Sequence, residues 1–374
     1  MSNANTRGTK PPHSIWIFSP EGAEPMHFRE LDTPALCVDL DVLEKNIDDL
    51  QSACNRLDIP LRVHTKTHKT PAIARKQIAA GAIGIVSQKL GEAEAMATGG
   101  IEDIMIPYNI VGKAKLARLT RLVQSGQSTI TVAADSSATV TGLSQAATEA
   151  DCTIRVVVEM DTGGGRVGTQ SPADTLVLAQ EIDRLPGLEF TGIMTYPSSE
   201  RARPYLDEVR TLILQAGLPL HMVSGGGTGS EEISKSLGCT ETRIGSYAYE
   251  GMTRVGKRED LDPSRCPLRM LVTVVSVSKP GQTIVDAGMK AFTSYPPMPH
   301  GYCLEHPEIF FKGMSVEHGH LDTTASEHKF TVGETLCFIP LHGGMTTNLH
   351  DRLFATRNGE VVEEWEVAGR GRAQ

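Results

Sequence analysis

Short apolar strands alternate with amphipathic helices from about residue 32 to residue 250, and this alternation constrains the fold more than any other feature. Each strand–helix unit occupies roughly 25–30 residues, the length of one unit of a parallel barrel. Eight such units predict an α/β fold with a (β/α)8 barrel, and a doubly wound open sheet is the competing topology. The predicted strands are Ala35–Asp39, Leu61–Val63, Ile83–Val86, Ile104–Pro107, Ile130–Ala133, Ile154–Val158, Phe190–Met194 and Met222–Ser224.

After residue 265 the pattern changes to short strands joined by turns, with few helical stretches. This change predicts a second, all-β domain, with a boundary in the charged stretch Arg254–Pro267. We therefore expect an N-terminal extension over residues 1–30, a barrel over residues 31–260 and a β domain over residues 261–374. The extension is rich in Ser, Asn, Gly and Pro, which is typical of a flexible arm or of a segment that wraps a dimer partner.

The charge balance and the cysteines limit the possible partners. The chain of 374 residues has a net charge of −9, which disfavours nucleic acid and anionic membranes as partners. No apolar run reaches membrane-spanning length, and the first 25 residues lack the apolar core of a signal peptide. The seven cysteines are scattered without a CxxC pair, which is typical of reduced thiols in the cytoplasm.

The segment Leu61–Lys69 concentrates unusual chemistry at the end of a predicted strand. It contains two histidines, two lysines and one arginine within nine residues. A lysine that is desolvated or crowded by cations loses proton affinity and becomes a nucleophile, and histidine titrates near neutral pH. Lys66 is therefore the candidate for a Schiff base with an aldehyde, most economically pyridoxal phosphate (PLP). A basic surface loop is the alternative, and it is the commoner explanation for such a cluster taken alone.

Two glycine-containing loops follow late strands of the predicted barrel. Ser224–Ser230 reads Ser-Gly-Gly-Gly-Thr-Gly-Ser, and Gly245–Tyr247 lies where the next such loop would fall. Glycines let backbone N–H groups approach an anion, and late barrel loops are a usual phosphate site. The spacing is neither a Walker motif nor GxGxxG, so it predicts a phosphate group rather than a nucleotide. A tight turn before a helix would also account for the glycines.

Further polar residues at predicted strand ends could contact a ligand. Arg166 follows a run of three glycines and could reach a ligand oxygen, or it could pair with a nearby carboxylate such as Glu159. Tyr196 ends the next strand, where it could pack on a cofactor or fill the core. In the β domain, His318 and His320 stand two apart on a predicted strand, so both point to one face and could bind a metal.

Taken together, these motifs resemble the D-threonine aldolase / D-serine dehydratase family, relatives of alanine racemase. The resemblance runs from about Leu31 to the C-terminus, and its motifs occur in family order. They are Leu31–Ala35, His64–Lys69, Glu159–Asp161, Gly165–Arg166, Ser224–Ser230, Gly245–Tyr247, Asp286–Gly288, Glu317–Gly319 and Asn348–Asp351.

The resemblance implies a fold-type III PLP enzyme, with a barrel and a C-terminal β domain, that is active as a homodimer on a small amino-acid substrate. Lys66 matches the lysine that carries PLP. We expect the cofactor also to contact Arg166, Tyr196, Ser224, Gly226, Gly227, Thr228, Gly245, Ser246 and Tyr247.

The chain departs from the family pattern at the metal site. Members carry His-x-Asp or His-x-Cys in the turn before Asn348–Asp351, whereas this chain has His342-Gly343-Gly344, so the second ligand is missing. Either a divalent metal binds through His342 with help from water and another residue, or the site works without metal.

Three reactions fit this pattern. The favoured prediction is cleavage of a β-hydroxy-D-amino acid to glycine and an aldehyde, with His342 or His64 as the base for the hydroxyl proton. Dehydration of a D-serine-like or 3-hydroxyaspartate-like substrate needs an acid at the leaving hydroxyl. Racemisation needs no metal but requires a second base opposite Lys66. A PLP carrier without enzymatic activity would lack the second domain, so the predicted β domain disfavours it.

Overall fold

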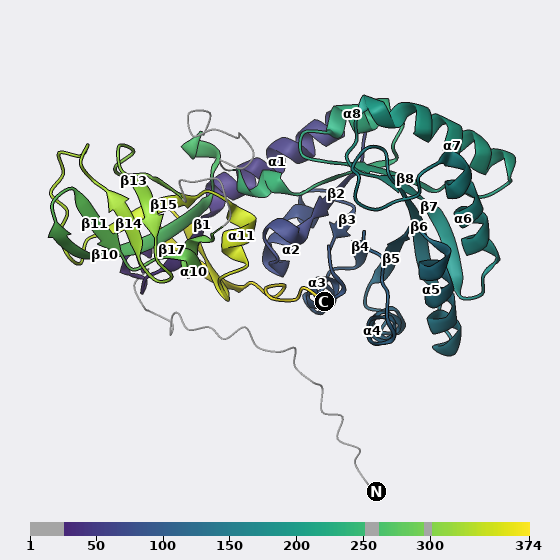
Figure 1. Cartoon of the computed structure of the whole chain (residues 1–374), viewed down its shortest axis with the longest axis horizontal. Coiled ribbons are helices and arrows are strands. Elements are labelled where there is room, and N and C mark those ends of the chain that lie inside the picture. The colour runs from purple at the N-terminus through teal and green to yellow at the C-terminus, as the bar shows by residue number, and fades with distance from the viewer. Residues whose placement is uncertain (1–25, 251–261, 295–300) are drawn as a thin grey trace, which may run out of the picture.

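The structure is a computed structural model that describes residues 26–250, 262–294 and 301–374. The predicted domain boundary at residues 260–261 lies outside the described residues, as do residues 1–25 of the predicted extension. An α/β barrel stands beside a β domain, and the C-terminus runs back to the barrel near helix α3 (Leu90–Thr98) (Figure 1). The fold class predicted from the sequence is confirmed.

Eight parallel strands close into the barrel in the order β2 to β9, so strands that follow one another in the chain are neighbours in the barrel. Most of their residues are buried, because helices cover the outside and side chains fill the inside. The strands are β2 (Leu61–His64), β3 (Gly84–Val86), β4 (Asp103–Ile106), β5 (Thr129–Ala134), β6 (Ile154–Met160), β7 (Leu188–Thr195), β8 (Met222–Gly226) and β9 (Glu241–Ile244).

Two of the longer helices begin at a residue whose side chain accepts a backbone N–H of the first turn. Asp39 accepts the N–H of Val42 at the start of α1, and Ser171 caps α6, whose first residue is Pro172. None of the helices in the described part of the chain has the length and apolar character needed to cross a bilayer. Besides α3, the longer helices are α1 (Leu40–Arg56), α2 (Pro71–Ala79), α4 (Lys113–Gln124), α5 (Ser137–Glu149), α6 (Pro172–Arg184), α7 (Arg203–Gln215) and α8 (Glu231–Ser236).

The β domain is built around the long strand β10, which pairs with β1, β11 and β15. Its core includes Phe292, Phe311 and Phe338, whose ring centroids lie 4.9–5.8 Å apart. The strands of this domain are β1 (Ala35–Asp39), β10 (Leu268–Lys279), β11 (Gln282–Val285), β12 (Gly301–Cys303), β13 (Phe310–Met314), β14 (Gly319–Asp322), β15 (Thr335–Pro340), β16 (Arg352–Arg357) and β17 (Glu360–Glu366).

Two strands differ from the prediction. The predicted first barrel strand, β1, lies in the β domain, between β10 and β16. A buried apolar run looks the same in either sheet, so periodicity could not assign it. The eighth barrel strand is instead β9, which escaped prediction because it reads Glu-Thr-Arg-Ile. Its charges are tolerated inside because they are paired; Glu241, for example, accepts hydrogen bonds from buried Arg62.

Candidate active site

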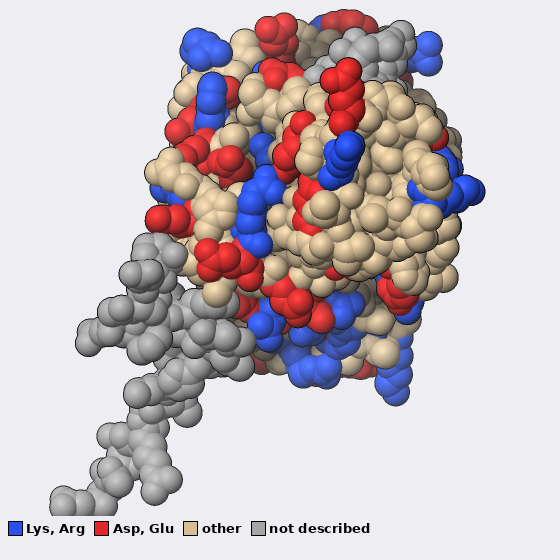
Figure 2. Space-filling view, turned by 90° about the vertical axis from the view of Figure 1, so that its left-hand side faces the viewer, with Lys and Arg blue, Asp and Glu red and all other residues tan. Residues whose placement is uncertain are grey.

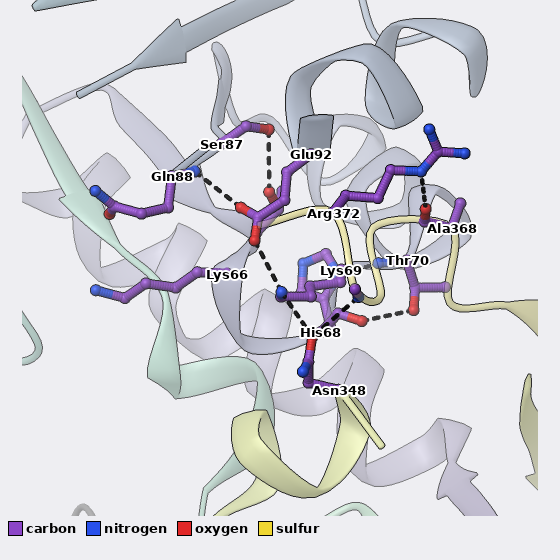
Figure 3. A network of polar contacts seen from close by, with 12 residues as sticks. Lys66, His68, Lys69, Thr70, Ser87, Gln88, Glu92, Asn348, Ala368 and Arg372 are labelled. Atoms are coloured by element: carbon purple, nitrogen blue, oxygen red, sulfur yellow. Dashed lines mark hydrogen bonds and ion pairs between the residues drawn. The ribbon is translucent and has the colours of Figure 1, made fainter. Parts of the chain in front are cut away.

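Lys66 lies at the carboxyl end of β2, at the mouth of the barrel. Strand β2 ends at His64, and the 3-10 helix η2 (Thr65–Thr67) follows directly. His64 Nδ1 accepts the backbone N–H of Lys66, and Thr65 Oγ1 donates to the carbonyl of Val86 on the neighbouring strand. Together with the Lys69 N–H, which donates to the carbonyl of Thr65, these bonds fix residues 64–69, which we call the lysine turn. The Lys66 side chain points away from the polar network beside it (Figure 3).

The surroundings of Lys66 lower the pKa of its ammonium group. Burial is the largest cause, and the guanidinium of Arg166 adds to it, whereas Glu92 acts in the opposite direction. A lowered pKa increases the fraction of neutral amine, the form that attacks an aldehyde. The crowding by cations predicted for Lys66 therefore occurs, but its main source is an arginine from another loop.

A pocket opens around Lys66. Tyr196 forms a partly exposed wall, and its ring centroid lies 6.0 Å from Lys66 Nζ and 5.2 Å from Arg166 Cζ, which is the range of cation–π contacts. Arg166 also lies 3.6 Å from the carboxylate of Glu159. The structure thus brings together four of the predicted site residues. The lining residues are His64, Lys66, Gln88, Pro107, Arg166, Met194, Tyr196 and Arg243.

Arg243, on β9, is a pocket residue that the sequence analysis missed. Its buried guanidinium donates to Ser224 Oγ and to the carbonyl of Thr195. Burial lowers its pKa, although the carboxylates of Glu241 and Glu159 oppose the shift. Arginine nevertheless stays protonated in proteins, so Arg243 supplies a permanent positive charge that favours an anionic ligand. The sequence feature that could have identified Arg243 is an arginine within a short strand whose residues are all buried.

The two glycine loops meet at the same mouth. Thr228 Oγ1 and Ser246 Oγ lie 2.5 Å apart, so hydroxyls from both loops converge. Gly229 has a φ of +71° with nothing near its missing side chain, so backbone conformation is what requires glycine there. A Cβ on Gly245 would lie 2.8 Å from the carbonyl oxygen of His64, so this glycine lets the second loop pack against the lysine turn.

Ser224, Gly226 and Tyr247 serve packing instead of facing the mouth. Ser224 is fully buried and donates to a carboxylate of β9. A Cβ on Gly226 would lie 2.7 Å from the carbonyl oxygen of Arg243, so this glycine permits close strand packing. The Tyr247 hydroxyl accepts a hydrogen bond from Gln77 on α2 at 2.8 Å. The cofactor contacts predicted for these three residues therefore find no support in the geometry.

Hydrogen bonds occupy both ring nitrogens of His64. Nδ1 accepts the Lys66 N–H, so the ring proton is on Nε2, which lies 3.1 Å from Gln88 Oε1. Burial, followed by the charge of Lys66, lowers the pKa of His64 well below its ordinary value and keeps the ring neutral. This arrangement supports a positioning role for His64 better than the predicted role as a base.

The turn that carries His342 packs against the lysine turn. His342 Nδ1 accepts the Met345 N–H at 3.2 Å and thereby caps the short helix α11 (Gly343–Thr347). A Cβ on Gly344 would lie 3.4 Å from Thr67 Cα and 3.6 Å from His342 Cε1, which are ordinary contact distances. Packing therefore does not require glycine at position 344. Burial lowers the pKa of His342, so its ring is neutral at pH 7.

A buried network joins the lysine turn to the β domain (Figure 3). Lys69 Nζ lies 2.9 Å from Glu92 Oε1 on α3 and donates to Asn348 Oδ1 at 2.8 Å. The other carboxylate oxygen of Glu92 accepts the backbone N–H of Gln88 at 3.0 Å. The carbonyl of Lys69 accepts the N–H of Gly369 from the C-terminal segment. The lysine turn, α3 and the end of the chain are therefore held as one unit.

Stability is expected to fall in acid because of His68. Burial lowers the pKa of this histidine from 6.5 to about 4, so between these values the unfolded chain binds more protons than the folded chain. The free energy of unfolding should therefore fall by up to about 3 kcal/mol as the pH drops through this window. Urea unfolding at several pH values would measure it, and His68→Gln should flatten the dependence. An equal slope in the variant would contradict this origin.

Comparison with known proteins agrees with this architecture. The alanine racemase N-terminal domain matches residues 38–253, and a serine dehydratase domain matches residues 267–356. D-threonine aldolase from Arthrobacter sp. is 36% identical, covering 91% of this chain and 93% of that protein. 3-Hydroxy-D-aspartate aldolase from Paracoccus denitrificans is 33% identical, covering 92% of this chain and 93% of that protein.

Solved structures give the same result. D-threonine aldolase from Filomicrobium marinum superimposes with a TM-score of 0.84 at 30% identity, covering 93% of this chain and 99% of that one. D-threo-3-hydroxyaspartate dehydratase from Delftia sp. HT23 gives a TM-score of 0.78 at 28% identity, covering 91% and 98%. A cysteine-to-alanine variant of this dehydratase has been solved in the metal-free form. The chain therefore belongs to the alanine racemase-like family that includes the D-threonine aldolases.

Proposed function

We propose that this chain is a PLP-dependent aldolase, a lyase that cleaves a β-hydroxy-D-amino acid to glycine and an aldehyde. The observation that carries the proposal is Lys66, a lysine of lowered pKa at the barrel mouth beside two glycine loops. The aldolase names of two relatives that span nearly the whole chain support the reaction. Dehydration is the second candidate, because the Delftia dehydratase has the same fold and 29% identity.

The residues present fit PLP. Lys66 Nζ would hold its aldehyde, and Thr228, Gly245 and Ser246 would hold its phosphate, since their hydroxyl and N–H groups converge beside the lysine turn. Tyr196 would contact it from the pocket wall. Bound there, PLP supplies an electron sink for the bond that breaks at the substrate Cα.

The family's divalent metal does not fit the residues present. Gly344 offers no side-chain ligand. His342 Nδ1 accepts a backbone N–H, which places the ring proton on Nε2, the nitrogen that would have to be free for a metal. Among the described residues, no group of three possible ligands includes His342. We therefore propose that the reaction depends on protein groups at this position.

Two protein groups would manage the proton and the charge of the β-hydroxyl. Lys66 Nζ, as a free amine of lowered pKa, can accept the hydroxyl proton and later return one to the Cα of glycine. His342, in the turn that packs beside Thr67, is the proposed hydrogen-bond donor to the oxygen as negative charge develops there. Arg166 and Arg243 keep the pocket positive and favour binding of the substrate carboxylate.

His342→Ala is expected to lower kcat about 10²-fold, because it removes a donor to the developing oxyanion. His342→Asn, whose amide can still donate, should keep more of the rate. Steady-state kcat and KM of both variants would test this. Thermal unfolding serves as the control, since loss of the cap of α11 alone costs about 1 kcal/mol. Wild-type kcat in His342→Ala would remove this histidine from the mechanism.

A substrate panel separates the three reactions. PLP-loaded enzyme would be incubated with D-threonine, D-phenylserine and D-serine, with and without EDTA. We expect aldehyde release that EDTA does not change. Keto acid with ammonia would identify a dehydratase, and loss of optical activity alone a racemase. Inhibition by EDTA that Mn²⁺ reverses would contradict the metal-independent mechanism. Gly344→Asp, which supplies the family's second ligand at a position where a Cβ fits, is the matched variant for the EDTA comparison.

The proposal includes a homodimer in the cytoplasm that acts on a small amino acid, without nucleic acid or membrane as partner. All seven cysteines are free and six of them are buried, as suits a reducing compartment. Figure 2 shows the end of the β domain, where acidic residues lie among many of the lysines and arginines and a group of basic residues lies at the lower edge. Light scattering of the purified chain would test the dimer.

A further inference from the structure

We propose that His306, His328 and Glu334 form a site for a divalent transition metal of the zinc class in the β domain. Within the described residues they are the only group of three possible ligands whose donor atoms lie within 4.8 Å of one another. These residues differ from the pair predicted from the sequence, His318 and His320, and His320 Nε2 is hydrogen-bonded to Ser315 at 2.9 Å.

The three residues come from two loops that lie side by side. His306 lies between β12 and β13, whereas His328 and Glu334 belong to the connection from β14 to β15. Two imidazoles and one carboxylate are a ligand set that suits Zn²⁺, and partial exposure leaves room for water at a fourth position.

Neighbouring groups orient the ligands as metal sites require. His306 Nδ1 lies 3.4 Å from the Glu308 carboxylate, and a metal-bound histidine commonly uses its second nitrogen in this way. Glu308 is itself held by the hydroxyl of Ser326. One oxygen of Glu334 accepts the Thr331 N–H at 3.0 Å, while the other lies 2.7 Å from His328 Nε2.

The two histidine rings stack on each other, which holds both imidazoles beside Glu334. The rings of His306 and His328 lie 4.6 Å apart at 24°, and both pack edge-on against Phe330. A divalent ion bound between them would take one nitrogen from each imidazole and one oxygen from Glu334. Zinc–nitrogen bonds of about 2.1 Å place donors roughly 3.4 Å apart, so the partly exposed side chains would close by small rotations.

The site is separate from the proposed active site. Strands β13 and β14 lie in the part of the β domain that faces away from the barrel (Figure 1). The inference therefore does not depend on PLP or on His342, and its test needs no activity measurement.

The test is zinc binding by the untagged, EDTA-treated full chain. Isothermal titration and metal analysis after gel filtration should give one equivalent of Zn²⁺. The affinity should fall at least about tenfold in His328→Ala and in Glu334→Gln. Bound Zn²⁺ should raise the melting temperature of wild type more than that of His328→Ala or Glu334→Gln.

Two variants control for other binding. His320→Ala and His342→Ala should bind one equivalent like wild type. Circular dichroism would show whether each variant is folded. If the histidine variants do not fold, Glu334→Gln, which keeps the shape of the side chain, still tests the site. Absence of Zn²⁺ binding in wild type, or equal binding in a folded His306→Ala/His328→Ala double variant, would overturn the proposal.

Discussion

Lys66→Ala is expected to abolish the proposed reaction, with a loss of at least about 10³-fold in kcat, because Lys66 is the only lysine among the described residues that line the pocket. The visible absorbance of lysine-bound PLP should disappear, and borohydride should no longer fix the cofactor to the protein. Absorbance spectra and mass spectrometry after reduction would measure both effects. The loss should exceed that of any other single replacement in the pocket.

Lys89 provides the matched control for this experiment. Its ammonium group lies 3.8 Å from the ring centroid of Tyr108, at a residue that lines the hollow next to the lysine pocket. Lys89→Ala removes a nearby positive charge but not the predicted attachment point, so its absorbance should remain. A reduced adduct on another lysine in wild type, or full absorbance in Lys66→Ala, would refute the assignment and with it the proposed function.

Lys69→Met is expected to lower the free energy of unfolding by about 3–5 kcal/mol. The side chains of Lys69 and Glu92 are only 13% and 4% exposed, so the replacement leaves a buried carboxylate without its counterion. It also breaks the contact with Asn348 that links the lysine turn to the β domain. Urea unfolding of the full chain would measure the loss.

Two further variants test whether the loss of stability comes from the unpaired buried charge. The double variant Lys69→Met/Glu92→Gln should recover a large part of the loss, because it removes the unpaired charge. Lys45→Met breaks an exposed pair with Asp49 and should cost at most about 1 kcal/mol. If Lys69→Met costs no more than Lys45→Met, the network contributes little to stability.

Local chemistry explains which parts of the molecule could be predicted. Apolar periodicity identified seven of the eight barrel strands, because buried parallel strands read as short apolar runs. Lys66 was found because a charged cluster is unusual after such a strand. Strand β9 was missed because it contains an arginine and a glutamate, which do not form an apolar run. These charges can be buried because of partners such as Arg62, which lies far away in the chain.

The contacts that complete the site are long-range and leave no local pattern. Lys69 and Asn348 are 279 residues apart, and nothing in either segment predicts their hydrogen bond. Arg243 reaches the pocket from β9, and Gly344 comes next to Thr67 only after the β domain has packed on the barrel. Conversely, Tyr247 was predicted from a motif, but its hydroxyl bonds inward to Gln77.

The position of β1 between β10 and β16 affects how the chain folds during its synthesis. This strand leaves the ribosome early, yet it pairs with Leu268–Leu271 and Phe354–Thr356, which are translated more than two hundred residues later. The barrel strands can all close before those partners exist, so the nascent chain holds an unsatisfied hydrophobic edge until synthesis ends. A fragment that begins after the barrel would lack a strand from the middle of its sheet, so separate expression of the two halves should yield an aggregation-prone product.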